Sequence, residues 1–136
     1  MRFLAFIFVL LLTGGCEHLQ PGCSPKNLRP GDLIAGADTV ETFTSDENAR
    51  QYSRTLSGEE ARKVVQAVST SERIRGFSNS IFTNEIRFFK DQGLFIGAVM
   101  MDGDGDFLFD GVEYRDHNGV LKQIYRDTQY PQYRFQ

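Results

Sequence analysis

Residues 56–71 read LSGEEARKVVQAVSTS, and this stretch decides the fold. Its apolar residues recur at spacings of three and four and so form one stripe along a helix: Ala61, Val64, Val65 and Val68. Ser57 can cap the helix, and Glu60 three residues later completes a capping box. Leu56, just before the cap, faces Ala61 in a hydrophobic staple. The sequence therefore predicts one main helix over about residues 57–71, with its stripe buried in a core.

Beyond the helix, from Ser80 onward, apolar and polar residues alternate with a period of two, which favours strands. We expect strands over residues 81–90, 94–101, 106–110, 112–115 and 120–126, separated by turns rich in Asp and Gly. Before the helix, the β-branched residues 39–44 predict a strand, and residues 45–54 predict a loop or a short helix capped by Ser45. The fold class is α+β: one main helix packed on a four- to five-stranded antiparallel meander sheet.

The order of strand, helix and meander over about residues 38–126 resembles the cystatin-like fold. In cystatins the pattern Gln-x-Val-x-Gly forms an inhibitory loop, whereas residues 66–70 here read QAVST and belong to the predicted helix. The final Gly is absent. The resemblance therefore implies a fold and carries no inhibitory activity with it.

The first sixteen residues have the layout of an export signal. Arg2 precedes an apolar run over residues 3–12, which is too short to cross a bilayer comfortably as a helix. Residues 12–16, LTGGC, resemble the lipobox of bacterial lipoproteins, although Thr13 stands where that family prefers Leu, Val or Ile. The resemblance implies cleavage after residue 15 and acylation of Cys16 with palmitate or a similar chain. The alternative is an ordinary cleaved signal in which Cys16 is incidental.

The remaining chain divides into three predicted parts. Residues 16–37 carry the lipidated cysteine and a flexible tether rich in Pro and Gly, residues 38–126 form the α+β domain, and residues 127–136 form a Tyr-rich tail. In a Gram-negative bacterium, Glu17 in place of Asp after the cysteine implies sorting to the outer membrane, facing the periplasm. Cys23 is left unpaired if Cys16 is acylated; otherwise the two cysteines can form a disulfide in an oxidising compartment.

The amino-acid composition argues against nucleic-acid binding and against a structural zinc site. The chain has 15 Lys and Arg against 18 Asp and Glu, and this mildly acidic balance disfavours nucleic-acid binding. Besides the two cysteines, only His18 and His117 could complete a structural zinc site, so zinc is not expected. No cofactor is indicated apart from calcium, which one acidic cluster leaves open.

An acidic cluster begins at Asp102. Counted from this residue, its members occupy positions 1, 3, 5, 9 and 12, which are oxygen-ligand positions of an EF-hand calcium loop: Asp102, Asp104, Asp106, Asp110 and Glu113. Phe107 stands at position 6, where the loop requires Gly, and the flanking residues predict strands rather than helices. The sequence thus leaves two interpretations open, a calcium site or two β-turns that use Asp and Gly for their geometry.

His117 lies beside Asp116 in a predicted turn, and a hydrolase would need a nucleophile close to such a pair. No motif places one, so we predict that the protein is not an enzyme.

The predicted strand over residues 94–101 is apolar on both faces, whereas one helix covers only one face of a sheet. Either the N-terminal segment or the Tyr-rich tail covers the second face, or that face binds a protein partner or a second copy of the chain.

The leading hypothesis is a small envelope lipoprotein, anchored through Cys16, that serves as a non-enzymatic binding or structural module. The alternatives are an inhibitor of a periplasmic hydrolase and a small hydrolase that uses His117.

Overall fold

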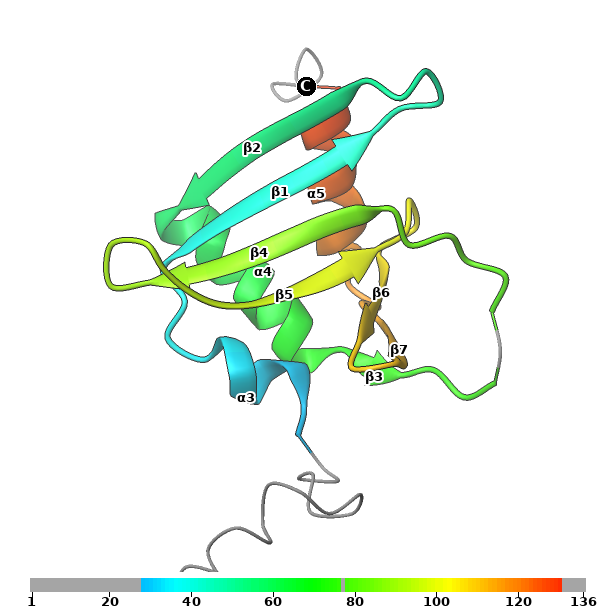
Figure 1. Ribbon diagram of the computed structural model, residues 1–136. Helices are drawn as coiled ribbons and strands as arrows, with labels where there is room; N and C mark the ends of the chain where they lie inside the picture. Colours follow the sequence, from blue (N-terminus) through cyan, green and yellow to red (C-terminus); the bar gives the residue numbers. More distant parts are fainter. Residues whose placement is uncertain (1–27, 77, 131–136) are drawn as a thin grey trace, which may run out of the picture.

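A computed structural model describes residues 28–76 and 78–130 (Figure 1). These residues form an α+β fold with three helices and a seven-stranded antiparallel sheet. The helices are α3 (Pro30–Ile34), α4 (Gly58–Thr70) and α5 (Val120–Gln129). The strands are β1 (Thr39–Ser45), β2 (Gln51–Ser57), β3 (Glu72–Arg73), β4 (Asn84–Lys90), β5 (Leu94–Met101), β6 (Asp106–Phe109) and β7 (Val112–Arg115).

The sheet has the strand order β2-β1-β4-β5-β6-β7-β3. The predicted meander is confirmed for β4 to β7, and β5 has the predicted bounds. Asp110 and Gly111 both have positive φ in the β6–β7 turn, as expected of a two-residue hairpin loop. The prediction of four or five strands was too low because β2 and β3 were not foreseen.

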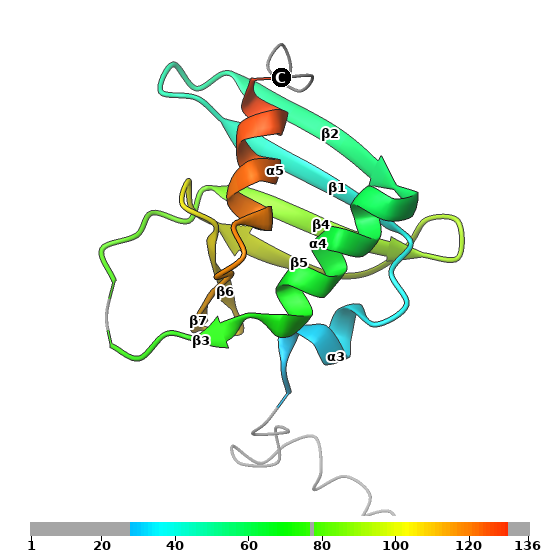
Figure 2. The same ribbon diagram turned by 180° about the vertical axis from the view of Figure 1, so that it is seen from behind.

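The helices α4 and α5 lie on the same face of the large strands, as Figure 2 shows from behind. Between them and the sheet lies the core, where the largest fully buried side chains include Phe88, Phe107, Ile86, Leu121 and Val68. Burial of this apolar surface is the main favourable term for folding.

The main helix, α4, forms as the sequence predicts, with Ala61, Val64 and Val68 buried. The predicted capping box is wrong, since Ser57 makes no side-chain cap hydrogen bond. Glu60 instead forms an ion pair with Arg54 of β2, the first strand in the sheet order.

Residues 120–126 form the first part of α5, so the predicted last strand is wrong. Leu121, Ile124 and Thr128 are buried at helical spacing against the sheet. The carboxylate of Asp116 accepts hydrogen bonds from the backbone N–H of Asn118 (3.0 Å), in the preceding turn, and of Leu121 (2.9 Å), which is one of the free donors in the first turn of the helix. The helix also takes in residues 127–129, which the prediction assigned to the tail.

Two further boundaries change. Residues 46–50 form the predicted loop, whereas Ser45 ends β1 and residues 51–54 begin β2. Residues 30–34, assigned to the flexible tether, form α3, and Ile34 is completely buried in the core. The ordered domain therefore begins before residue 38. The predicted resemblance to cystatins rested on strand, helix and meander, whereas this chain places a hairpin before α4 and a second long helix at the end.

Candidate functional site

None of the helices in the described part of the chain lies on one face of the sheet formed by β2, β1, β4 and β5 (Figure 1). Along β1, Val40, Thr42 and Thr44 are buried beneath the helices, so the alternate residues Glu41 and Phe43 point to the other side. The same alternation places Glu85 and Arg87 of β4, and Ala98 and Met100 of β5, on this uncovered face. We call it the open face.

The open face is hollowed at the end of the strands near the β1–β2 turn. The hollow has a volume of about 480 Å³, and its lining includes Phe43, Tyr52, Ser53, Glu85, Arg87 and Met100. These residues come from four different strands, so the hollow exists only once the sheet has formed. Below, it is called the open-face hollow.

Arg87 contacts both an aromatic ring and a carboxylate in the hollow. Its guanidinium carbon lies 4.3 Å from the centre of the Phe43 ring, a cation–π arrangement. Its Nε and Nη2 donate to Glu85 at 2.8 and 3.1 Å. These hydrogen bonds raise the pKa of Arg87 above its ordinary value. The guanidinium of Arg87 is thus held by Glu85 beside apolar surface from Phe43 and Met100.

The hollow borders the edge of the sheet. Strand β2 pairs with β1 on one side and is the first strand in the sheet order, so its other side has no neighbouring strand among residues 28–76 and 78–130. Gln51, Tyr52 and Ser53 line the hollow from this edge strand. An unpaired edge can accept a further strand from another chain.

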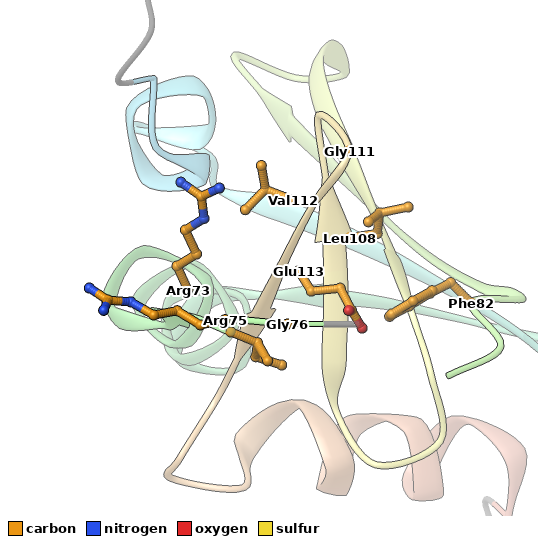
Figure 3. Close-up of a pocket in the computed structure, with 9 residues that line it drawn as sticks. Arg73, Arg75, Gly76, Phe82, Leu108, Gly111, Val112 and Glu113 are labelled. Carbon is orange, nitrogen blue, oxygen red and sulfur yellow. The ribbon is translucent and has the colours of Figure 1, made fainter. Parts of the chain in front are cut away.

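A second cavity, of about 690 Å³, lies between the segment after β3 and the β6–β7 hairpin (Figure 3). Figure 3 shows the guanidinium groups of Arg73 and Arg75 directed away from Phe82 and Leu108. Glu113 is engaged by the Ser78 hydroxyl. Because its charged groups do not converge on a common point, we do not assign this cavity a ligand.

The structure does not assemble the five carboxylates of the predicted calcium loop. Asp102 and Asp106 are almost fully buried, while Asp104 and Asp110 are exposed. Asp102 accepts hydrogen bonds from the backbone N–H groups of Asp104 (2.9 Å) and Asp106 (3.0 Å), as a turn residue does. No group of three or more His, Cys, Asp or Glu side chains that could hold a metal is found in the described part of the chain.

Two of these carboxylates already have protein partners. Asp106 accepts from Nε of Arg115 at 3.0 Å and from its Nη2 at 2.9 Å, and the pairing raises the pKa of Arg115. Glu113 is the acceptor for Ser78. The geometry thus favours the turn interpretation of the acidic cluster over the calcium interpretation.

His117 lies in the exposed turn before α5, where its Nε2 is 3.1 Å from a carboxylate oxygen of Glu72. Asp116, its neighbour in the chain, is occupied with the helix cap. The two residues therefore do not form the His–Asp pair that the hydrolase alternative requires.

The predicted lipidation site, Cys16, and the residues Cys23 and His18 lie outside the described residues, as does the tail beyond Tyr130. None of the described helices has the length and apolar character needed to span a bilayer.

Sequence reasoning missed the open-face hollow. A signal was present, because residues 39–45 alternate in the strand pattern and place Phe43 opposite the buried Val40, Thr42 and Thr44. The partners of Phe43 come from β2, β4 and β5, and the strand order that joins them is not visible in the sequence.

No protein family, curated protein or solved structure matches this chain.

Proposed function

We propose that this protein is an exported lipoprotein, acylated at Cys16, whose α+β domain is a non-enzymatic module that binds a protein partner. The observation that carries the binding role is the open-face hollow, which combines half-buried apolar surface, the Arg87–Glu85 ion pair and a strand edge without a neighbour among the described residues. The export signal and the lipobox-like residues 12–16 support the anchor.

The chemistry of the hollow favours an extended segment of the partner. One part of such a segment would pair its backbone with the free edge of β2. Because Met100 lies three strands away from β2, the residues that follow would cross the hollow and place an apolar side chain on Phe43 and Met100. Main-chain hydrogen bonds would supply affinity, and the hollow would select the side chain. The Arg87–Glu85 pair at the rim would favour a polar group beside that side chain.

A photo-crosslinking amino acid at Ser53 tests the site in the full-length chain, in the cells that produce it. The matched control carries the same group at Ile81, which is 74% exposed and lies outside the hollow. We expect a protein crosslinked at Ser53 and absent at Ile81. That partner is then purified, and its affinity is measured for the wild type, Met100→Glu, Ile81→Glu and His117→Ala.

Met100→Glu places a second carboxylate beside Glu85 and should weaken binding by about tenfold or more, a change of about 1.4 kcal/mol. Ile81→Glu and His117→Ala should bind as the wild type does. Equal affinity of Met100→Glu and Ile81→Glu, with thermal melting showing both folded, would refute the hollow as the binding site.

Mass spectrometry of the protein extracted from membranes tests the anchor separately. We expect a mature chain that begins at Cys16 and carries the mass of its acyl groups. A chain that keeps Met1, or one cleaved without acylation, would contradict the lipoprotein assignment and leave the hollow unaffected.

A further inference from the structure

The exposed apolar side chains are concentrated at one corner of the domain. Six large hydrophobic residues are exposed among those described, and four of them lie either where the described chain begins or at the start of β5. These four are Leu28, Leu33, Leu94 and Phe95, with exposed fractions of 41, 39, 57 and 55%. We call them the apolar corner.

One close approach connects α3 with the strand that carries Leu94 and Phe95. The side chain of Leu33 lies directly over Gly97, since a Cβ added at Gly97 would be 2.6 Å from Leu33 Cδ2. Gly97 is three residues after Leu94 on the same strand. Figures 1 and 2 agree that α3 lies beside β5, on the side of the sheet where the described chain begins.

Phe95 is also held by a neighbour in β4. Its ring makes an edge-to-face contact with Phe89, with 5.8 Å between the ring centres. An exposed aromatic ring fixed in this way loses little conformational freedom on contact with another surface. Phe95 thus gives the corner a preformed aromatic surface.

We propose that the apolar corner rests on the lipid surface that holds the acyl chains of Cys16, so that it sets the orientation of the domain. The inference rests on the anchor in the proposed function. Residues 17–27 join Cys16 to the described chain and can reach at most about 36 Å when extended. Within that reach the contact is intramolecular, so a small apolar surface suffices where it would fail for an untethered protein.

The charges around the corner favour an apolar contact over attraction to anionic headgroups. They are of both signs and nearly balanced: Arg29, Asp32, Asp38, Lys90 and Asp91. A basic cluster, which anionic lipid would require, is lacking among these residues.

The depth of the contact is limited by β5 itself. Strand β6 pairs only with Met100 and Met101, so the backbone of Leu94 to Val99 has no strand on that side within residues 28–76 and 78–130. Unpaired backbone groups are costly in hydrocarbon, whereas the headgroup region offers water. In the headgroup region of the membrane, the apolar side chains can reach the acyl chains while the unpaired backbone groups of β5 still hydrogen-bond to water.

A second copy of the chain is the competing occupant, because the same edge could pair with another β5. The two occupants differ in what a fluorescent probe at Phe95 would touch, brominated acyl chains or protein. The chain contains no Trp, so Phe95→Trp introduces a single indole at a position that is already aromatic and exposed.

The experiment uses the mature chain, residues 16–136, with Cys23→Ser and a phospholipid maleimide coupled to Cys16. The synthetic anchor makes the test independent of whether cells acylate Cys16, so its failure is distinct from failure of the proposed function. The chain is reconstituted into phosphatidylcholine vesicles with and without brominated acyl chains. The control is Ile81→Trp, at an exposed apolar position away from the corner.

We expect brominated lipid to reduce the emission of F95W by about twofold or more and to leave I81W nearly unchanged. Adding Leu94→Asp to F95W should return its emission towards that of I81W. Equal quenching of the two tryptophans would overturn the proposal. So would a blue-shifted emission of F95W that bromine does not quench, which would assign the corner to contact between copies.

Discussion

Gly105→Ala tests how α5 packs on the turn between β5 and β6. Gly105 has a φ of +88°, a backbone conformation in which a side chain is strained. A Cβ at this position would lie 2.8 Å from the backbone nitrogen of Lys122, in the first turn of α5, and 3.3 Å from its Cα. Because the obstacle is helix backbone, no side-chain rotation can relieve the clash.

The expected loss of stability has two parts. Placing Ala in the left-handed region costs about 1–2 kcal/mol, and forcing additional volume into a packed site costs about 1–3 kcal/mol. Gly105→Ala should therefore destabilise the domain by about 2–5 kcal/mol. Gly111→Ala is the matched control, because Gly111 has a φ of +73° with nothing within 4 Å of an added Cβ. It should lose only about 1–2 kcal/mol.

Urea unfolding of the wild type and both variants, fitted with a common slope, measures the difference. The two variants share the backbone strain, so the excess loss in Gly105→Ala reports the contact with α5 alone. A Gly105→Ala variant no less stable than Gly111→Ala would refute the packing of α5 on this turn. It would also reopen the sequence-based expectation of a strand over residues 120–126.

Three further outcomes follow from the described contacts. Asp116→Ala removes both hydrogen bonds at the start of α5 and should lower the free energy of unfolding by about 1–2 kcal/mol in urea titration; an unchanged midpoint would contradict the cap. Burial raises the pKa of Tyr125 above 10.0, so the unfolded chain ionises first as the pH rises. The stability from this group is therefore complete below pH 10 and is lost as the pH rises through the folded pKa. Tyr125→Phe should lose less stability above pH 10 than the wild type does, in urea midpoints measured on either side of that pH, and a parallel loss in both would refute the assignment. Millimolar calcium should leave the melting temperature unchanged, because Asp106 is paired with Arg115 and the acidic side chains do not converge; a clear rise would restore the calcium interpretation.

The elements that the sequence predicts well are those whose local signals agree. Strand β5 has turns at both ends and an apolar run between them, and its bounds were predicted correctly. The apolar residues of α4 recur at helical spacing without a competing signal, and this helix was also predicted correctly. For residues 120–126 the signals conflict, because VLKQIYR is short and its apolar residues fit the period of a strand as well as that of a helix. The burial of Leu121 and Ile124 against the sheet decides for helix.

Strand β2 was missed for a different reason. Its inward residues include Arg54, a charged side chain that an isolated strand pattern assigns to solvent. In the structure Arg54 is largely buried and pairs with Glu60, with Asp127 at 4.0 Å. These partners lie on α4 and α5, so the pattern of β2 makes sense only once both helices are in place.

The candidate site likewise depends on contacts between residues that are far apart in the sequence. The acidic cluster looks like a ligand set when its residues are counted along the chain, yet the turn directs Asp102 to backbone donors and leaves Asp104 exposed. The open-face hollow shows no spacing pattern at all, because its residues belong to four strands. Sequence spacing can predict sites made from one continuous segment, whereas this hollow depends on the order of strands in the sheet.

The two proposed surfaces constrain each other through β5. Phe95 belongs to the apolar corner and Met100 to the open-face hollow, and the five residue steps between them along the strand span about 17 Å. If the corner rests on lipid, the hollow is held above the headgroups with its β2 edge directed away from the anchor. A partner that enters as an extended segment then approaches from the aqueous side without displacing lipid. Phe95→Trp in vesicles should accordingly remain quenched when the partner binds, and Met100→Glu should weaken the partner without releasing the corner.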